Sequence, residues 1–381
     1  MKIEKYDDKF TPEQSSLTSA SGRRTAAPAN AAAILLFLCA LPAMAQQKTV
    51  FPAFEVSSGT PLLSQAASTG AVVGQGGNYS LPLSDGRTLW FLNNIWTGER
   101  KADGQSAVWG VVDGAAALSV SSAAPAGSGS LSYVSDENKW PLPLLSGDMK
   151  EYSQARKFWP RSGFSSGGRY YVFFSIMNNY GPDTYDYFRV GQGLAWSDDP
   201  RGPYQKARHG EHYSFWNDIE PAFGSAVLQD GDGWVYVYGR LTTAPGEHAA
   251  ALARVRPEDA ASLEKYSYYS VETASGTWSG DCAESAPVME KMPDEFSVSY
   301  NEFLKSYLAV YFDPESGSVT ARRAPYPWGP WSGGVPLFSC RKEDYCYGAK
   351  EQPGFASAGG GRIFLTLEKK NAPYLYQLTF K

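Results

Sequence analysis

The sequence of 381 residues has few charged residues, histidines and cysteines, and it has no long basic run. Only 19% of the residues are charged, there are three His and four Cys, and the net charge is −5. Nucleic-acid binding needs clustered Lys and Arg to displace counterions, and basic residues here occur only as short pairs. The His and Cys residues do not form a zinc motif. We therefore expect no nucleic-acid partner, no metal and no cofactor.

Long hydrophobic runs are also missing. The longest apolar stretch, residues 31–43, follows Arg23 and Arg24 and ends just before Ala45. Such a charged segment, short apolar segment and small-x-small sequence are typical of an export signal, and roughly 13 residues are too few to span a bilayer. We predict cleavage near Ala45, a secreted or periplasmic location and no membrane span in the mature chain; a membrane anchor is the alternative. The predicted regions are a signal peptide over 1–45, an irregular arm over 46–72 and one domain over 73–381.

Three cysteines remain after the predicted cleavage. Cys340 and Cys346 are close enough in sequence to close a small loop in an oxidising compartment. We predict a disulfide between them, and Cys282 is left unpaired.

Glycine, proline and aromatic residues are abundant. The 38 Gly, 25 Pro, 24 Tyr and 11 Trp favour an all-β protein with many turns. Five hairpin patterns recur, each with a β-branched or aromatic run on both sides of a turn that contains Gly, Asp or Asn. The paired runs are 79–83 with 88–92, 158–164 with 169–176, 221–228 with 234–238, 296–300 with 306–312, and 355–358 with 362–367.

Two Pro-x-Gly-Pro-aromatic stretches are in phase with these hairpins. They begin at Pro200 and Pro327, 127 residues apart, which is two units of about 64 residues. Each unit has room for about four strands, and one helical turn over 257–263 replaces the Pro-Gly-Pro turn in the third unit. We predict a five-bladed β-propeller with about four antiparallel strands per blade. A β-sandwich or two β-domains are the alternative. Third strands are predicted at 107–112, 193–197, 249–255 and 318–322.

Several of these segments resemble the DUF4185 family and its relative DUF5005. The resemblance covers residues 73–381 and rests on motifs that occur in the family's order: SDGRTLWF at 84–91, YVYG at 236–239, WGPW at 328–331 and CYGA at 346–349. It implies a glycoside-hydrolase-like five-bladed propeller, and some members are similar to endo-acting D-arabinanases. The implied partner is a polysaccharide, with arabinan as one type, or an oligosaccharide, and we expect a monomer.

Candidate functional residues lie where the inner strands are predicted to begin, because these points converge on one mouth of the central funnel. Cleaving a glycosidic bond needs two carboxylates, one to protonate the leaving oxygen and one to activate water or attack carbon. The acids at these points are Asp218, Glu220, Asp294, Glu295 and Glu351. We predict Glu220, Glu295 and Asp218 as catalytic residues. The predicted substrate-binding residues are Asn78, Asn94, Trp159, Arg161, Trp216 and Glu351.

The sequence departs from the family pattern at three places. The segment up to Asn78 lacks an acid, and Asn93-Asn94 and Ser162 stand where the resemblance implies Asp. Asn has the shape of Asp but cannot act as a base or nucleophile at neutral pH. Two functions therefore stay open: a hydrolase that uses other acids, and a catalytically inactive propeller that binds carbohydrate or recognises a surface.

Overall fold

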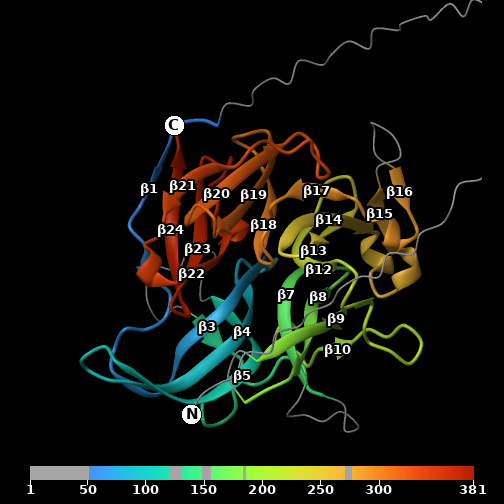
Figure 1. Ribbon diagram of the computed structural model, residues 1–381. Coiled ribbons are helices and arrows are strands. Elements are labelled where there is room, and N and C mark those ends of the chain that lie inside the picture. Colours follow the sequence, from blue (N-terminus) through green and yellow to red (C-terminus); the bar gives the residue numbers. More distant parts are fainter. Residues whose placement is uncertain (1–50, 120–130, 148–155, 183–185, 271–276) are drawn as a thin grey trace, which may run out of the picture. The chain divides into compact units, whose positions relative to one another are not determined.

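The computed structural model describes residues 51–119, 131–147, 156–182, 186–270 and 277–381 (Figure 1). The predicted signal peptide lies outside these ranges. In the unit from Lys48 to Lys381, five antiparallel sheets form a five-bladed β-propeller, which confirms the predicted fold class. Helical structure in the described ranges is limited to short 3₁₀ turns, and no helix among them is long and apolar enough to cross a membrane.

The first three blades follow one another along the chain. Blade one contains β3 (Ser68–Pro82), β4 (Thr88–Arg100), β5 (Ser106–Ser119) and β6 (Leu131–Tyr133). Blade two contains β7 (Arg156–Ser166), β8 (Arg169–Asn179), β9 (Tyr187–Ser197), β10 (Gln205–Lys206) and β11 (Trp216–Asn217). Blade three contains β12 (Ala222–Gln229), β13 (Val235–Ala244), β14 (Glu247–Val255), β15 (Ser267–Ser270), β16 (Thr277–Ser279) and β17 (Pro287–Glu290).

Blade four is continuous along the chain, whereas blade five combines strands from both ends of the described chain. Blade four contains β18 (Phe296–Asn301), β19 (Ser306–Asp313), β20 (Ser318–Ala324) and β21 (Val335–Ser339). Blade five contains β22 (Cys346–Glu351), β23 (Arg362–Lys369), β24 (Ala372–Phe380) and the early strands β1 (Phe54–Val56) and β2 (Thr60–Pro61). The 3₁₀ turns are η1 (Pro257–Asp259), η2 (Leu263–Lys265), η3 (Cys282–Glu284), η4 (Lys342–Asp344) and η5 (Pro353–Phe355).

Four of the five predicted hairpins pair as expected, but the fifth is placed wrongly. In blade five the strand that pairs with β23 is β22, and residues 353–355 form η5 instead of a strand. The segment predicted as an irregular arm also contains structure, because β1 and β2 both pair with β24. The beginning and the end of the propeller are thus joined within one sheet.

The two Pro-x-Gly-Pro stretches connect the third and fourth strands of blades two and four, as predicted. Both contain a cis peptide bond, at Gly202-Pro203 and Gly329-Pro330. After the first turn β10 pairs with β9, and after the second β21 pairs with β20. In blade three the connection is instead made by η1 and η2, close to the predicted helical turn.

The hydrophobic core is divided among the blades. Five clusters of buried apolar residues are present in the described chain, and each lies between two neighbouring blades. The innermost strands β3, β7, β12, β18 and β22 contact one another around the axis. Buried charged and amide side chains lie on these strands, including Asn78, Arg161, Lys350 and Glu351. Polar groups therefore line the axis, and they need partners there because an unpaired buried polar group is costly.

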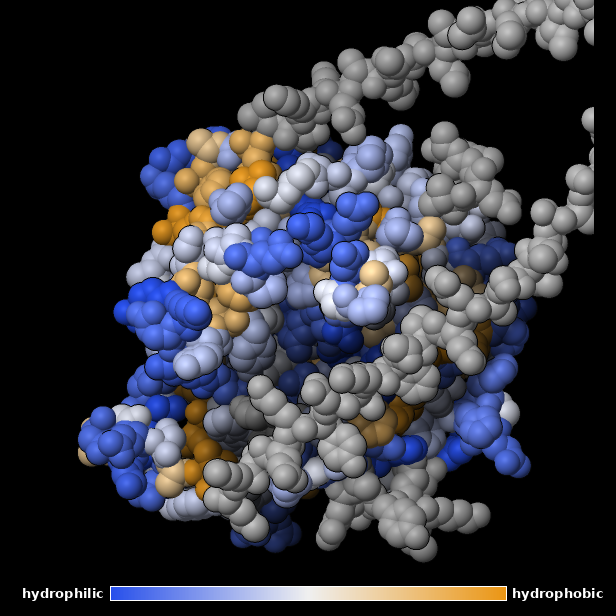
Figure 2. Space-filling view, viewed as in Figure 1, coloured by the Kyte–Doolittle hydropathy of each residue, from blue (hydrophilic) through white to orange (hydrophobic). Residues whose placement is uncertain are grey.

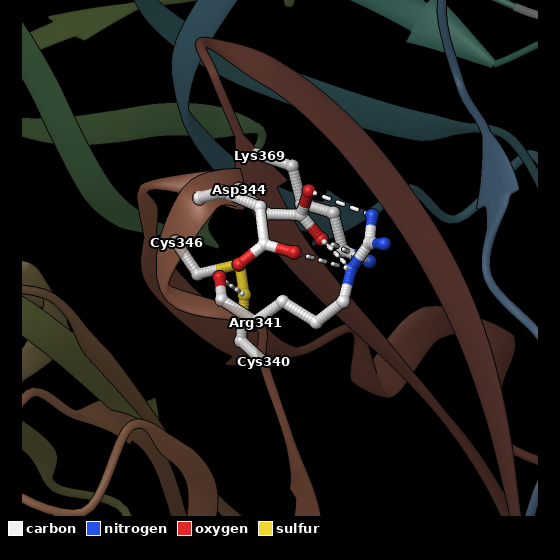
Figure 3. The surroundings of a disulfide bond; sticks show 6 residues. Cys340, Arg341, Asp344, Cys346 and Lys369 are labelled. Carbon is white, nitrogen blue, oxygen red and sulfur yellow. Dashed lines mark hydrogen bonds and ion pairs between the residues drawn. A yellow bond between two sulfur atoms is a disulfide. The ribbon is translucent and has the colours of Figure 1, made fainter.

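A disulfide joins Cys340 to Cys346, as predicted (Figure 3). It connects the end of β21 in blade four to the start of β22 in blade five. Within the loop that it closes, Arg341 Nη2 lies 3.0 Å from Asp344 Oδ1, and Asp344 Oδ2 is 3.8 Å from Lys369 Nζ (Figure 3). Cys282 is free.

Candidate functional site

Arg161 of β7 is the buried cation around which the axial site is built. Its side chain is only 2% exposed. Nη1 donates to Asp294 Oδ2 at 2.8 Å, and Nη2 donates to the Asp294 carbonyl oxygen at 2.8 Å and to Ser225 Oγ at 3.1 Å. Glu295 Oε1 lies 3.9 Å from Nη1. One guanidinium thus links blade two with blade three and with the segment just before β18.

Asp294 is an ionised carboxylate at the mouth of the axis. Its side chain is 40% exposed, and Arg240 Nε lies 3.8 Å from its Oδ1. Burial opposes ionisation, but the charges of Arg161 and Arg240 outweigh it and hold the pKa of Asp294 at about 2. The carboxylate therefore stays charged at any physiological pH.

Glu295 is paired with the buried amine of Lys350. Lys350 Nζ donates to Glu295 Oε2 at 2.5 Å and to the carbonyl of Gly348 at 3.0 Å, and it also lies 4.5 Å from the ring centroid of Tyr79. Lys350 is 2% exposed and Glu295 is 19% exposed. Glu295 is thus the carboxylate that connects the buried axis with the open mouth.

Glu368 of β23 is a buried carboxyl group that reaches the axis from the second strand of blade five. Its Oε1 accepts a hydrogen bond from Asn78 Nδ2 at 2.5 Å. Burial raises its pKa to about 8; Lys350 opposes this rise and Glu295 adds to it. At neutral pH Glu368 is therefore mostly protonated, whereas a carboxyl group in water would be ionised.

Asn78 lies inside the axis. It is fully buried and adopts a positive φ of 49°. Its Oδ1 accepts from Gln75 Nε2 at 2.6 Å, and its backbone carbonyl accepts from Gln352 Nε2 at 3.0 Å. The amide is thus occupied on both sides, by Gln75 and by Glu368, and it orients the Glu368 carboxyl group.

Glu351 lies deeper in the axis than was expected. The prediction placed it at the start of an inner strand, but it is the last residue of β22. It lines a small cavity of about 50 Å³, and its Oε2 accepts from Ser299 Oγ at 2.5 Å. Burial raises its pKa to about 7, although the Ser299 hydrogen bond opposes the rise. Its side chain is far less accessible than that of Glu295.

Asp218 and Glu220 belong to an exposed turn in front of β12. Glu220 Oε2 accepts from the backbone amide of Asn217 at 2.7 Å, so the carboxylate closes its own turn. Arg189 holds the same turn by donating to the carbonyl oxygens of Asn217, Asp218 and Glu220 at 2.8, 2.6 and 3.0 Å. Neither carboxylate has a contact with Glu295 in the described residues. The structure therefore brings Glu295 together with Asp294 and Glu368, and not with Glu220.

The predicted aromatic contacts differ in accessibility. Trp216 is 1% exposed, and its ring packs against Phe223 while Nε1 donates to Tyr268, so it is a core residue. Trp159 is half-buried, with its ring centroid 6.1 Å from that of Tyr187. Trp159 is therefore the predicted aromatic residue that lies within reach of a ligand.

Asn94 is half-buried on β4 and adopts a positive φ of 47°. The preceding Asn93 is buried, and its Nδ2 donates to the carbonyl of Pro160 at 3.5 Å. Asn93 thus contacts the middle of β7, and Asn94 follows it on β4.

Further aromatic side chains are exposed on blades one and two. Trp109 of β5 is 50% exposed, and Tyr180 and Phe188 contact each other with centroids 6.1 Å apart. Lys157 forms an ion pair with Asp113 at 3.0 Å. A hydrophilic hollow lies near the centre of the face drawn in Figure 2. No group of three His, Cys, Asp or Glu suited to a metal ion is found in the described part of the chain.

The main residue that the sequence reasoning missed is Glu368. The predicted site residues came from the starts of inner strands, whereas Glu368 lies on β23, the second strand of blade five. The available signal was Gly348 in the CYGA motif. Glu368 Oε2 lies only 1.8 Å from the place that a β-carbon on Gly348 would occupy, so the missing side chain is what lets Glu368 reach the axis.

Comparison with known proteins identifies the family. The model of the family described as "Domain of unknown function (DUF4185)" matches residues 132–379, and the chain belongs to this family. This bears out the predicted resemblance. Among curated proteins, none matches the chain.

Solved structures share the fold. A candidate hydrolase from Bacteroides ovatus ATCC 8483 is 16% identical with a TM-score of 0.61, covering 82% of this chain and 87% of that one. A protein of unknown function from Dyadobacter fermentans DSM 18053 is 10% identical with a TM-score of 0.51, covering 87% of this chain and 100% of that one. Zg3597, a family 117 glycoside hydrolase from Zobellia galactanivorans, is 11% identical with a TM-score of 0.49, covering 87% and 92%. At these identities the first two comparisons establish the fold alone.

Proposed function

We propose that the protein is a carbohydrate-active propeller that cleaves a polysaccharide at the mouth of its axis, with Glu295 as the central carboxylate. One observation carries the proposal. Glu295 is partly exposed, and it lies between Asp294, which is ionised, and Glu368, which holds a proton at neutral pH. Neighbouring carboxyl groups whose environments push their pKa values apart are the arrangement that acid–base chemistry needs.

The spacing of the carboxylates suits glycoside hydrolysis. Arg161 Nη1 lies 2.8 Å from Asp294 Oδ2 and 3.9 Å from Glu295 Oε1, which limits the separation of these two oxygens to 6.7 Å at most. Carboxyl groups are about 5–5.5 Å apart in retaining glycosidases and about 6.5–9.5 Å apart in inverting ones. The Asp294–Glu295 pair is therefore near enough for one carboxylate to face the sugar while the other faces its leaving oxygen.

Accessible aromatic side chains on blades one and two would supply surfaces for the sugar. Trp159 is half-buried, and Trp109 is half exposed. Exposed aromatic rings offer large apolar faces at low entropic cost, and they suit a ligand that is apolar on one face and hydroxylated at its edges. The resemblance to the family makes an arabinan-type polymer the first substrate to test.

A non-catalytic role is the second candidate. Each carboxylate of the axial group is already engaged: Asp294 and Glu295 by cations, and Glu368 by the Asn78 amide. Glu368 is also completely buried. These contacts favour a rigid mouth that binds a glycan without cleaving it.

Incubation with arabinan and a panel of neutral and acidic glycans, followed by product chromatography, tests the proposal. We expect oligosaccharides from at least one glycan with the wild-type protein, and a loss of at least 100-fold with Glu295→Gln. The matched control is Glu220→Gln, which changes a carboxylate at the neighbouring blade. Glycan binding without any products would instead establish the non-catalytic function.

We further propose that the protein acts outside the cytoplasm. The charged and apolar segments before Ala45 support export, and the Cys340–Cys346 disulfide is consistent with an oxidising compartment. N-terminal sequencing of protein recovered from the periplasm or the medium tests this; a chain that begins at residue 46 is expected, and an uncleaved chain retained with the cells would contradict it.

A further inference from the structure

We propose that Glu295 and Glu368 form one acid pair that holds a single proton, and that Glu368 is the buried partner that supplies this proton to Glu295. The existence of the Glu295–Glu368 pair does not depend on any enzymatic activity. Its catalytic consequence rests on the proposed function.

The two carboxyl groups meet over the Cα of Gly348. The place of a β-carbon on this glycine lies 1.8 Å from Glu368 Oε2 and 3.0 Å from Glu295 Oε2, so the two oxygens are at most 4.8 Å apart. No atom of a third side chain is nearer to that place. Gly348 adopts a positive φ of 63°, which suits glycine and strains other residues. A glycine is therefore needed both for the backbone and for the contact between the carboxyl groups.

The facing oxygen of Glu368 has no other partner. Oε1 is bound by Asn78, but Oε2 is buried and makes no hydrogen bond to any described residue. A buried carboxylate oxygen without a donor is costly, whereas a protonated oxygen is neutral and needs only an acceptor. Among the axial groups, the acceptor that faces this oxygen is Glu295 Oε2, whose distance from Gly348 limits the separation to the value above.

The charges around the pair act differently on its two members. Lys350 of β22 faces the pair and is bound to Glu295 Oε2. Tyr79 and Asn78 of β3 also face the pair, and neither carries a charge. Asn78 does not ionise, and burial raises the pKa of Tyr79 well above its usual value. Beyond Glu295, Arg161 is already matched by Asp294. Glu295 is near both Lys350 and Arg161, whereas Glu368 is fully buried. Repulsion between two adjacent carboxylates is therefore relieved when Glu368 keeps its proton.

The proton transfer conserves charge within the site. As the O–H bond on Glu368 Oε2 breaks, an O–H bond forms on Glu295 Oε2, and the electron pair stays on Glu368 beside Lys350. Glu295 then protonates the leaving oxygen of the glycan while the C–O bond breaks. Water adds OH to the anomeric carbon, and its released proton returns to the pair. Glu368 acts through Glu295 and is a positioning residue in this scheme.

Infrared spectroscopy of the folded protein tests the pair without any substrate. The stretch of a protonated carboxyl group in Glu368 is expected at pH 6, is expected to disappear as the pH passes about 8, and is expected to be absent in Glu368→Gln. In Glu295→Gln the neighbouring negative charge is gone and Lys350 is free to pair with Glu368, so the Glu368 titration is expected to move at least one pH unit lower.

Glu351 provides the matched control, because it is a second buried acid whose pKa is raised by burial, to about 7. Its band is assigned with Glu351→Gln and is expected to stay in place in Glu295→Gln. An unchanged Glu368 titration in Glu295→Gln, or a protonated band that Glu368→Gln does not remove, would overturn the pair. Because the two variants are read separately, failure of one to fold leaves the other as a test.

A pH–rate profile separates the pair from the proposed function. If a glycan is cleaved, Glu368→Gln is expected to shift the alkaline limb of kcat while KM changes less than threefold; an unchanged limb counts against a proton-supplying role. If infrared coupling is found and no glycan is cleaved, the pair stands and the hydrolase proposal fails.

Discussion

Glu220 and Glu295 occupy equivalent places in neighbouring blades but have different surroundings. Each lies just before an inner strand, Glu220 before β12 and Glu295 before β18. Glu220 bonds to the backbone of its own turn. Glu295 instead contacts Lys350 of blade five and approaches Arg161 of blade two.

The difference shows that position within a repeat does not determine the role of a side chain. Arg189, the cation nearest to the turn of blade three, is used to hold three backbone carbonyls. Arg161 and Lys350, in contrast, direct their charge at carboxylates. Chemistry is therefore expected where cations from other blades converge, which is at blade four.

The largest expected effect on stability is at Arg161. Arg161→Met removes the buried cation that Asp294 binds, although Asp294 is partly exposed and keeps Arg240 nearby. Breaking a fully buried ion pair costs about 3–5 kcal/mol, and we expect a loss near the lower end of that range. The matched change Arg169→Met removes an exposed ion pair with Asp198 and is expected to cost much less, because solvent screens exposed pairs. Urea denaturation of both variants measures the difference. Equal losses would mean that the cation cluster at blade four is no more than a surface network.

Glu351→Gln is expected to change how stability depends on pH. The pKa of Glu351 is about 7 in the folded protein and near 4.5 in the unfolded chain, so the folded state binds more protons between these values. Unfolding free energy therefore falls as pH rises from about 4.5 to 7, by roughly 3 kcal/mol at 1.4 kcal/mol per unit. The Gln variant is expected to lose this dependence, as thermal melts between pH 4 and 9 will show. A slope that persists unchanged would argue against a buried neutral Glu351.

Removing the disulfide is expected to have a smaller effect. The bridge closes a loop with a sequence separation of 6, for which the chain-entropy model gives about 2 kcal/mol. Cys340→Ser should lower the free energy of unfolding, measured by urea denaturation, by that amount. It should leave the Glu295 surroundings intact, because the bridge lies at the start of β22. If the Glu368 titration shows that the variant has lost the Lys350–Glu295 pair, the Cys340–Cys346 disulfide between blades four and five helps to position the site.

The smallest expected effect is at Arg240. Its guanidinium lies 3.8 Å from Asp294 and helps to hold the pKa of that carboxyl at about 2. Arg240→Gln is expected to raise this pKa while changing stability by less than about 1 kcal/mol, because the pair is partly exposed. Carbon-13 NMR titration of the Asp294 carboxyl measures it. If the pKa of Asp294 does not rise in this variant, Arg161 alone is responsible for its low value.

Much of the propeller was predictable because its hairpins are local. Turns that contain Gly or begin with Asn, between runs of aromatic and aliphatic residues, indicated β7 with β8 and β18 with β19 correctly. The hairpin of blade five was misplaced because β22 has a register shift between Tyr347 and Lys350 and is followed by a 3₁₀ turn. The pairing of β1 with β24 joins residues more than 300 positions apart, and no local pattern reports it.

The site was predictable only in part. Arg161 and Glu295 were found because inner strands were predicted to begin near them; Glu295 does precede β18, whereas Arg161 lies in the middle of β7. Pairing between carboxylates and cations depends on which blade each side chain faces. Glu220 and Glu295 look alike in sequence, and only the fold shows that one closes its own turn. Glu368 reaches the axis only because Gly348 has no side chain. The proximity of these two residues is visible only in the folded structure.

The central claim is that the acid chemistry of this propeller lies at Glu295 and not at Glu220. The most direct test is the rate of product release from one cleaved glycan, compared among the wild-type protein, Glu295→Gln and Glu220→Gln, with unfolding midpoints confirming that both variants are folded. We expect a loss of at least 100-fold for Glu295→Gln and less than threefold for Glu220→Gln. The reverse order, or equal losses, would contradict the account.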